Sequence, residues 1–237
     1  MHITYNGVTN TEVGAELVDI DIPSRSGQQA ETLTIPGRVS PLLRIYPQRD
    51  AYSITVTMRM LYDADLSAVY SWLNGSGTLI FSDTPDRYYL VSACSAISSK
   101  RIGAANTIRE IKIKLTCAPF AYAVSNDQVE LPSSPAQLQT IGTMYSEPLI
   151  ELTGTGDVAL TVNGVTLDIS GMSGTIYIDV RTCQVYKIEY GSKVSILSST
   201  TGLIEKMVLV PSADAVNVIS WTGDVSSLKI TKNERWQ

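Results

Sequence analysis

Alternation of apolar and polar residues with a period of two recurs along this chain and constrains its fold more than any other feature. In YSITVTMRM, apolar residues from Tyr52 to Met60 alternate with serine, threonine and arginine. The segment REIKIKLTC repeats the pattern between Ile111 and Cys117. Because successive side chains of a strand point to opposite faces, both segments are predicted to be strands with one buried face.

One convincing helix is predicted between these two strands, in the segment DADLSAVYSWLNG. Its apolar stripe, at helical spacing, consists of Leu66, Val69, Tyr70 and Leu73. Asp63 or Asp65 can cap its first turn, and Gly75 can end it. Trp72 lies to one side of the stripe. An apolar stripe of this kind is typical of a helix packed on a sheet.

The second half of the chain opens with a clear hairpin signal, DVALTVNGVTLDI. A type I′ turn at Asn163-Gly164 places six aliphatic residues on one face. Short apolar segments follow at regular spacing: GTIYIDV, CQVYKIEY, KMVLVP, AVNVISW and SSLKIT. This spacing predicts an antiparallel β-sandwich. We therefore expect a mainly β protein with two antiparallel sandwich domains, the first carrying the helix.

The domain boundary is predicted in a proline- and serine-rich stretch of low periodicity, VSNDQVELPSSPAQLQTIGTMYSEP. Residues 1–125 would form the first domain, 126–145 an extended linker, and 146–237 the second domain.

The stretch FSDTPDRYYLVSACS concentrates charged and aromatic side chains, and it could be either an active site or a turn between two strands. Asp83, Pro85 and Asp86 are turn formers, and an apolar run begins after Arg87. The turn is therefore the favoured interpretation.

Catalytic groups are scarce. The chain has one histidine, His2, which argues against histidine-based triads and histidine-rich zinc sites. Cys94, Cys117 and Cys183 lack the spacing of a metal site or a disulfide framework. The catalytic alternative is a carboxylate pair of the glycosidase type, with candidates Glu147, Glu151, Asp157, Asp168 and Asp179. We expect surface acids instead, no enzymatic activity, and no cofactor or metal.

Charge is unevenly divided. Residues 1–125 hold 11 Lys or Arg and 11 Asp or Glu, whereas residues 126–237 hold 7 and 12. With a pI near 4.9 and no basic cluster, specific nucleic-acid binding is not expected. Neither a signal peptide nor a membrane anchor is predicted, since no apolar stretch approaches the roughly 20 residues of a spanning helix.

Several segments together resemble the distal tail proteins of long-tailed, non-contractile bacteriophages and their prophages. The matching segments are Pro36-Gly37-Arg38, the strand at 52–60, WLNGSGTL, SDTPDRYYLVS, CAPFAY, EPLIELTGTGDVALTVNG, GTIYIDVRTCQVY and KITKNERWQ. They follow the family's order and span nearly the whole chain. One departure is visible: Val39-Ser40-Pro41 follows the Pro-Gly-Arg, where the family usually has a small polar turn.

The resemblance implies a ring-forming N-terminal sandwich and a peripheral galectin-like or carbohydrate-module-like second sandwich. It implies a structural role in the virion, after synthesis in the bacterial host cytoplasm. The expected partners are further copies of the chain, in a ring that would be a hexamer, the tail tube protein, the tail-tip hub protein, and receptor-binding or baseplate proteins.

Two sets of residues are candidates for contacts. For the ring, the segment from Pro23 to Arg38 is expected to form an extended polar arm across a neighbour, with charged contacts from Arg38, Arg44, Arg49 and Arg87. The alternative function is binding of host cell-wall glycans by the second sandwich, for which Trp221 and Tyr190 are candidate contacts.

Overall fold

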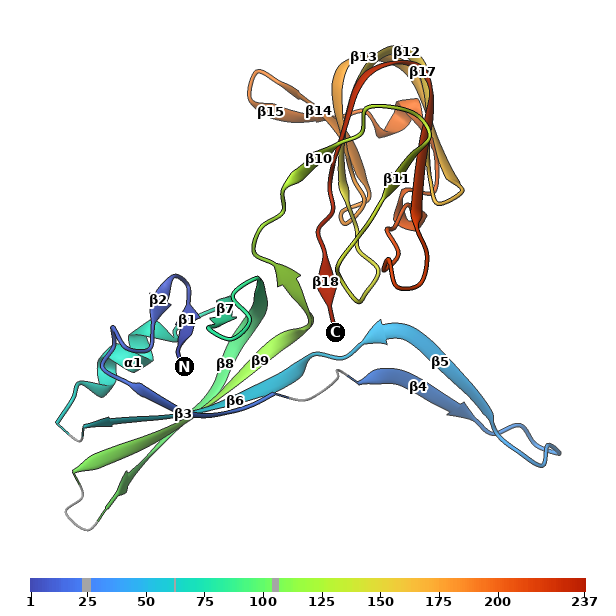
Figure 1. Cartoon of the computed structure of the whole chain (residues 1–237). Coiled ribbons are helices and arrows are strands. Elements are labelled where there is room, and N and C mark those ends of the chain that lie inside the picture. The colour runs from blue at the N-terminus through green and yellow to red at the C-terminus, as the bar shows by residue number, and fades with distance from the viewer. Residues whose placement is uncertain (23–26, 62, 104–106) are drawn as a thin grey trace. The chain divides into compact units, whose positions relative to one another are not determined.

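The computed structural model describes residues 1–22, 27–61, 63–103 and 107–237. It is built almost entirely of antiparallel strands and confirms the predicted mainly β class (Figure 1). The described residues divide into two compact units, Met1–Val124 and Ser125–Trp236. That the two units fold independently of each other remains a prediction.

In its described residues, the first unit contains one helix and nine strands. Their bounds are β1 Ile3–Tyr5, β2 Val8–Thr9, β3 Glu16–Asp21, β4 Gln28–Leu33, β5 Leu42–Arg49, β6 Tyr52–Leu61, α1 Leu66–Trp72, β7 Gly77–Phe81, β8 Arg87–Ile102 and β9 Ile108–Ala123, with the order β2-β1-β7-β8-β9-β6-β3 in the main sheet. Strands β4 and β5 form a separate two-stranded sheet.

Strand β6 pairs along its whole length with the first part of β9, from Tyr52↔Cys117 to Leu61↔Ile108. The apolar sets predicted from the sequence face inward on both strands, as Ile54, Val56, Met58, Ile111, Ile113 and Leu115 are all buried. The predicted alternation is therefore confirmed, and these side chains form the centre of the first core.

Helix α1 packs on this core through Val69 and Leu73. Asp65 is the N-cap residue; its carboxylate accepts a hydrogen bond from the Ser67 backbone at 2.8 Å, and hydrogen bonds from Ser67 lower the pKa of the Asp65 carboxyl. The predicted stripe needs one correction. Tyr70 is 45% exposed, whereas the Trp72 ring packs against the core. The Nε1 of Trp72 donates to the backbone oxygens of Tyr5 in β1 and Val8 in β2.

Within the stretch FSDTPDRYYLVSACS, residues 82–86 form the turn between β7 and β8, as favoured from the sequence, and Arg87 begins β8. The backbone N–H of Arg87 donates to the Thr84 carbonyl within this turn. Strand β8 then pairs with β9, and three register shifts between Tyr89 and Ala96 bend the pair.

The second unit contains the remaining strands and two short 3₁₀ helices. Their bounds are β10 Gln128–Glu130, β11 Ala136–Leu138, β12 Leu149–Val162, β13 Val165–Asp179, β14 Gln184–Glu189, β15 Ser192–Ser195, η1 Leu197–Ser199, β16 Thr200–Gly202, η2 Ile204–Lys206, β17 Asn217–Thr231 and β18 Arg235–Trp236. The strand order is β10-β17-β12-β13-β14-β15, with β11 also pairing β17 and β16 also pairing β13.

Three long strands, β12, β13 and β17, curve over the core of this unit (Figure 1). The predicted hairpin register is confirmed, since Val162 pairs with Val165, Leu160 with Leu167 and Val158 with Ile169. The segments GTIYIDV, AVNVISW and SSLKIT are not separate strands. They belong to β13 and β17, because register shifts bend these strands without ending them. KMVLVP contributes only an isolated bridge through Leu209.

The stretch 126–145, expected to be a linker, contains β10 and β11 and belongs to the second unit. Strand β11 pairs with the first half of β17, and β10 pairs with its second half. The sequence concealed this role because the strands have only three residues each, too few for periodicity, and prolines lie between them. Short edge strands tolerate such neighbours.

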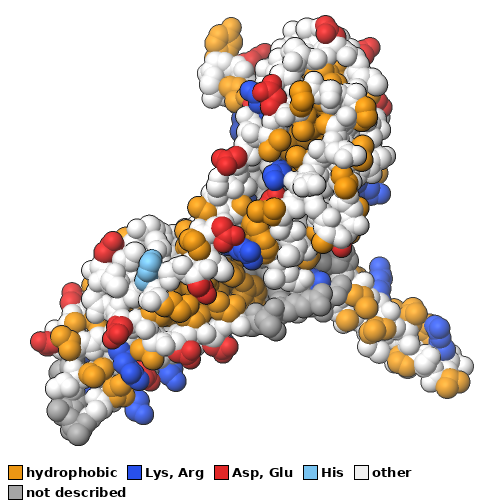
Figure 2. Space-filling model, viewed as in Figure 1, with side chains coloured by type: hydrophobic (Ala, Val, Ile, Leu, Met, Phe, Trp, Pro, Cys, Tyr) orange, Lys and Arg blue, Asp and Glu red, His pale blue; other side chains and the backbone are white. Residues whose placement is uncertain are grey.

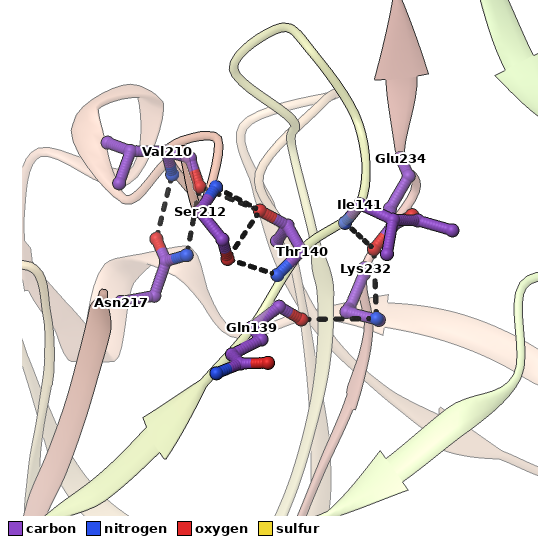
Figure 3. Close-up of polar contacts among 8 residues, drawn as sticks. All are labelled: Gln139, Thr140, Ile141, Val210, Ser212, Asn217, Lys232 and Glu234. Atoms are coloured by element: carbon purple, nitrogen blue, oxygen red, sulfur yellow. Dashed lines mark hydrogen bonds and ion pairs between the residues drawn. The ribbon is translucent and has the colours of Figure 1, made fainter. Parts of the chain in front are cut away.

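A polar network holds the segment after β11 in place (Figure 3). The Thr140 backbone donates to Ser212 Oγ at 2.7 Å, and the Asn217 side chain bonds both backbone groups of Val210. Glu234, which is buried, accepts from the Ile141 backbone and pairs with Lys232 at 2.8 Å. These bonds satisfy polar groups that would otherwise be costly to bury.

Candidate assembly interface

The β4–β5 hairpin, which we call the arm, is a two-stranded ribbon whose strands pair only with each other among the described strands. Its register runs from Gln28↔Arg49 to Leu33↔Leu42, and the chain reverses through the Pro36-Gly37 turn. An isolated two-stranded hairpin is marginally stable in water. The arm therefore depends on further contacts for its stability.

Large apolar side chains of the arm are exposed. Figure 2 shows them along the hairpin, at the lower right of that view. The exposed set is Leu33, Ile35, Val39, Leu42, Leu43 and Ile45. Leu43 and Ile45, for example, are 60% and 58% exposed, although a strand residue of this type is normally buried. An exposed apolar ribbon of this kind is typical of a protein–protein contact.

Three of the four predicted contact arginines lie on the arm. Arg38 follows the turn, where its backbone N–H donates to Ile35. The Arg44 guanidinium lies 5.0 Å from the centre of the Tyr46 ring. The Tyr46 hydroxyl donates to the Glu31 carboxylate at 2.6 Å, and this hydrogen bond raises the pKa of the phenol.

Arg49 and Arg87 differ from these exposed arginines. Arg49, at the base of the arm, has an Nε that is buried without a hydrogen-bond partner among the described residues. Arg87 begins β8 in the main sheet and pairs with Asp86 at 3.1 Å. The structure therefore gathers Arg38, Arg44 and Arg49 on one hairpin and leaves Arg87 on another element.

The arm differs from the polar segment expected between Pro23 and Arg38. Residues 23–26 lie outside the described part of the chain. The remainder forms β4 and the turn, and sequence reasoning missed the second strand, β5. The available signal was the Pro-Gly turn flanked by Leu33 and Leu42, which reads as a hairpin.

In the second unit, the two proposed glycan contacts lie on strands that are not neighbours. Tyr190 is at the turn between β14 and β15 and fully exposed, whereas Trp221 lies on β17 and packs partly against the core. Two other strands separate β14 from β17 in the sheet. Tyr190 and Trp221 therefore do not form a single site through adjacent strands.

A shallow groove of about 460 Å³ lies on the β13–β14 face of this unit. It is lined by Ser173, Thr175, Tyr177, Lys187, Ile188 and Glu189. Tyr177 alternates with the buried Ile176 and Ile178, so its ring is on the outer face, stacked on Tyr186 with centroids 5.4 Å apart. The alternation of Ile176, Tyr177 and Ile178 in the sequence indicates an outward-facing Tyr177, but its place beside Ser173, Thr175 and β14 becomes evident only from the strand pairing.

The five candidate catalytic acids serve local contacts or lie on the surface. Glu147 pairs with Arg235 at 3.1 Å, and Glu151 accepts from Gln128. Backbone N–H groups donate hydrogen bonds to Asp157 and Asp179, while Asp168 is exposed.

Among the described residues, no cluster of His, Cys, Asp or Glu is suited to a metal ion. In the same part of the chain, no helix has the length and apolar character needed to cross a membrane.

No protein-family model matches the sequence, and no curated protein matches it. Among the similar solved structures is the crystal structure of the Dit (gp 19.1) protein of phage SPP1, a paradigm of the hub adsorption apparatus in phages that infect Gram-positive bacteria. The TM-score is 0.76 at 13% identity, and the match covers 100% of this chain and 99% of that chain. The distal tail resemblance indicated by the sequence is therefore confirmed for the fold: this chain has the fold of the SPP1 Dit protein along its whole length.

Proposed function

We propose that the protein is a structural component of a phage tail tip, where copies assemble into a ring. The ring joins the tail tube protein to the hub and to receptor-binding or baseplate proteins. The whole-length fold similarity to SPP1 Dit, a hub protein, supports this role. The protein would act in the virion, by assembly and without catalysis.

The observation that carries ring assembly is the exposed arm. A ring requires a heterologous interface, in which one surface of each copy meets a different surface of the next. The arm supplies one such surface, since Leu42, Leu43 and Ile45 are exposed in the single chain. Covering them would contribute favourably, at roughly 25 cal/mol per Å² of apolar area buried.

The test compares assembly of the wild type with that of Leu43→Glu/Ile45→Glu, at high concentration, by sedimentation velocity and negative-stain microscopy. We expect closed rings of six copies from the wild type and monomers from the variant. The matched control is Ile141→Glu/Leu203→Glu, which places the same charges on exposed apolar positions of the second unit. Rings from the arm variant, or a wild-type chain that stays monomeric, would refute the proposal.

A second candidate function is weak glycan binding by the second unit, favoured by the groove beside Tyr177. Hydroxyl groups, a lysine, a carboxylate and an aromatic ring suit a polyhydroxylated ligand. Binding of purified cell-wall polysaccharide, measured by calorimetry, should be lost in Tyr177→Ala and retained in Trp221→Ala. Equal binding by Tyr177→Ala and the wild type would exclude this groove.

A further inference from the structure

The edge strand β3 is the second surface of interest in the first unit. It ends the main sheet, and among the described strands it pairs only with β6, so its other side is a sheet edge. A register shift between Leu17 and Asp19 leaves Val18 out of the pairing. Leu17 and Ile20 pack against the core, and this packing anchors the strand to the sheet.

The exposed side chains of β3 and its flanks are acidic and apolar. Glu16, Asp19 and Asp21 are exposed, and Val18 and Ile22 are 42% and 38% exposed. Residues 11–22 contain four acids and no Lys or Arg. Protective charges are common on edge strands, but large exposed aliphatic side chains between them work against that protection.

The arm has the complementary character. Residues 32–45 contain Arg38 and Arg44 and no acid, together with the exposed leucines and isoleucines. Arg38 is more available than Arg44 for a contact with another chain, because Arg44 already stacks on Tyr46 and lies opposite Glu31 in the strand register. Both surfaces therefore combine apolar side chains with charges of opposite sign.

We propose that β3 of one copy receives the arm of the neighbouring copy. Arg38 and Arg44 of the arm face Glu16, Asp19 and Asp21, and the aliphatic side chains of the arm cover Val18 and Ile22 of the receiving strand. An extended strand docking on a sheet edge gains main-chain hydrogen bonds and places alternate side chains against the partner. The occupant is a second copy of this chain, so the inference rests on the ring assembly proposed above.

The experiment reverses charge on each surface of the full-length chain. Asp19→Lys/Asp21→Lys changes the edge, and Arg38→Glu/Arg44→Glu changes the arm. We expect each variant alone to raise the concentration needed for rings at least about tenfold, since tenfold corresponds to only ~1.4 kcal/mol. Mixing the two variants in equal amounts should restore rings, because each altered surface then meets an oppositely charged partner. A single chain carrying all four substitutions should also form rings.

The control is Asp63→Lys/Asp83→Lys, which gives the same change in net charge at exposed acids elsewhere in the first unit. Circular dichroism verifies that every variant is folded. If the edge variant behaves like this control while Leu43→Glu/Ile45→Glu still yields monomers, docking at β3 is wrong but arm-mediated assembly stands. If neither change affects the rings, both proposals fail.

A groove elsewhere in the first unit is an alternative docking site for the arm, and a further variant distinguishes it from β3. A groove of about 380 Å³ lies between the end of α1 and β8, lined in part by Tyr70, Ser92 and Ile97. Loss of rings in Tyr70→Glu, together with an edge variant that matches the control, would place the arm in that groove and overturn the assignment to β3.

Discussion

The arm and the β12–β13 hairpin are both antiparallel ribbons rich in leucine, isoleucine and valine, and each contains a turn glycine with positive φ, +84° at Gly37 and +81° at Gly164. Their surroundings differ. In β12–β13 the aliphatic residues alternate with polar ones, and one face is buried in the core. In the arm, aliphatic residues occupy both faces, since Leu42 and Leu43 are adjacent and both exposed.

The difference shows that apolar content alone does not fix burial within a chain. Strict alternation produces one polar and one apolar face, and a sheet can bury the apolar face against the core of its own chain. A ribbon with apolar residues on both faces cannot bury both faces in this way. In the proposed ring, contacts with a neighbouring copy would cover these side chains.

The largest effect is expected from Leu160→Ala in β12. Leu160 is fully buried in the second core. Removing its side chain leaves a cavity and should lower the free energy of unfolding of the second unit by about 2–5 kcal/mol. Urea denaturation followed by fluorescence measures this loss. An unchanged midpoint would mean that the hairpin is not part of the cooperative core.

A smaller effect should separate the two turns. Gly164→Ala and Gly37→Ala place a side chain in the left-handed region, with open space around the added carbon at both positions. The backbone cost is roughly 1–2 kcal/mol in each case. We expect Gly164→Ala to lower the unfolding free energy by about 1 kcal/mol. Gly37→Ala should leave the global transition unchanged, because the arm can open locally.

Hydrogen exchange checks the cause of this difference. Amides of β4 and β5 should exchange rapidly in the dilute monomer, while those of β12 and β13 remain protected. If Gly37→Ala lowers global stability as much as Gly164→Ala, the arm folds cooperatively with its unit and the contrast between the hairpins is lost.

The parts of the fold that were predictable from the sequence are those governed by local rules. Alternation identified β6 and β9 with their buried faces, and Asn163-Gly164 fixed the hairpin register to the residue. Both signals act over a few residues, where side-chain periodicity or turn geometry leaves one solution.

The parts that were missed depend on distant partners. Strands β10 and β11 are recognisable only through their pairing with β17, which lies about 80–100 residues further along the chain. The continuity of β17 through Gly223 was hidden because glycine usually marks a turn, whereas here it lies within a bent strand.

Among the candidate contact residues, the four arginines could be named from the sequence, but their division between the arm and β8 required the hairpin register.

The smallest effect is expected from Leu43→Ala in the arm, and it distinguishes the two hairpins most sharply. The same leucine-to-alanine change that should cost several kcal/mol at Leu160 removes a side chain that is already 60% exposed, so little burial is lost. In dilute solution, where the chain is monomeric, the unfolding free energy should change by no more than about 0.5 kcal/mol. Ring assembly at high concentration should nevertheless weaken, because the leucine contributes to stability only when a neighbour covers it. Urea denaturation of the monomer and sedimentation of the concentrated protein measure the two quantities separately. A loss of monomer stability without any change in assembly would mean that the arm packs against its own chain, and the contrast with β12–β13 would then reflect a difference in degree of burial alone.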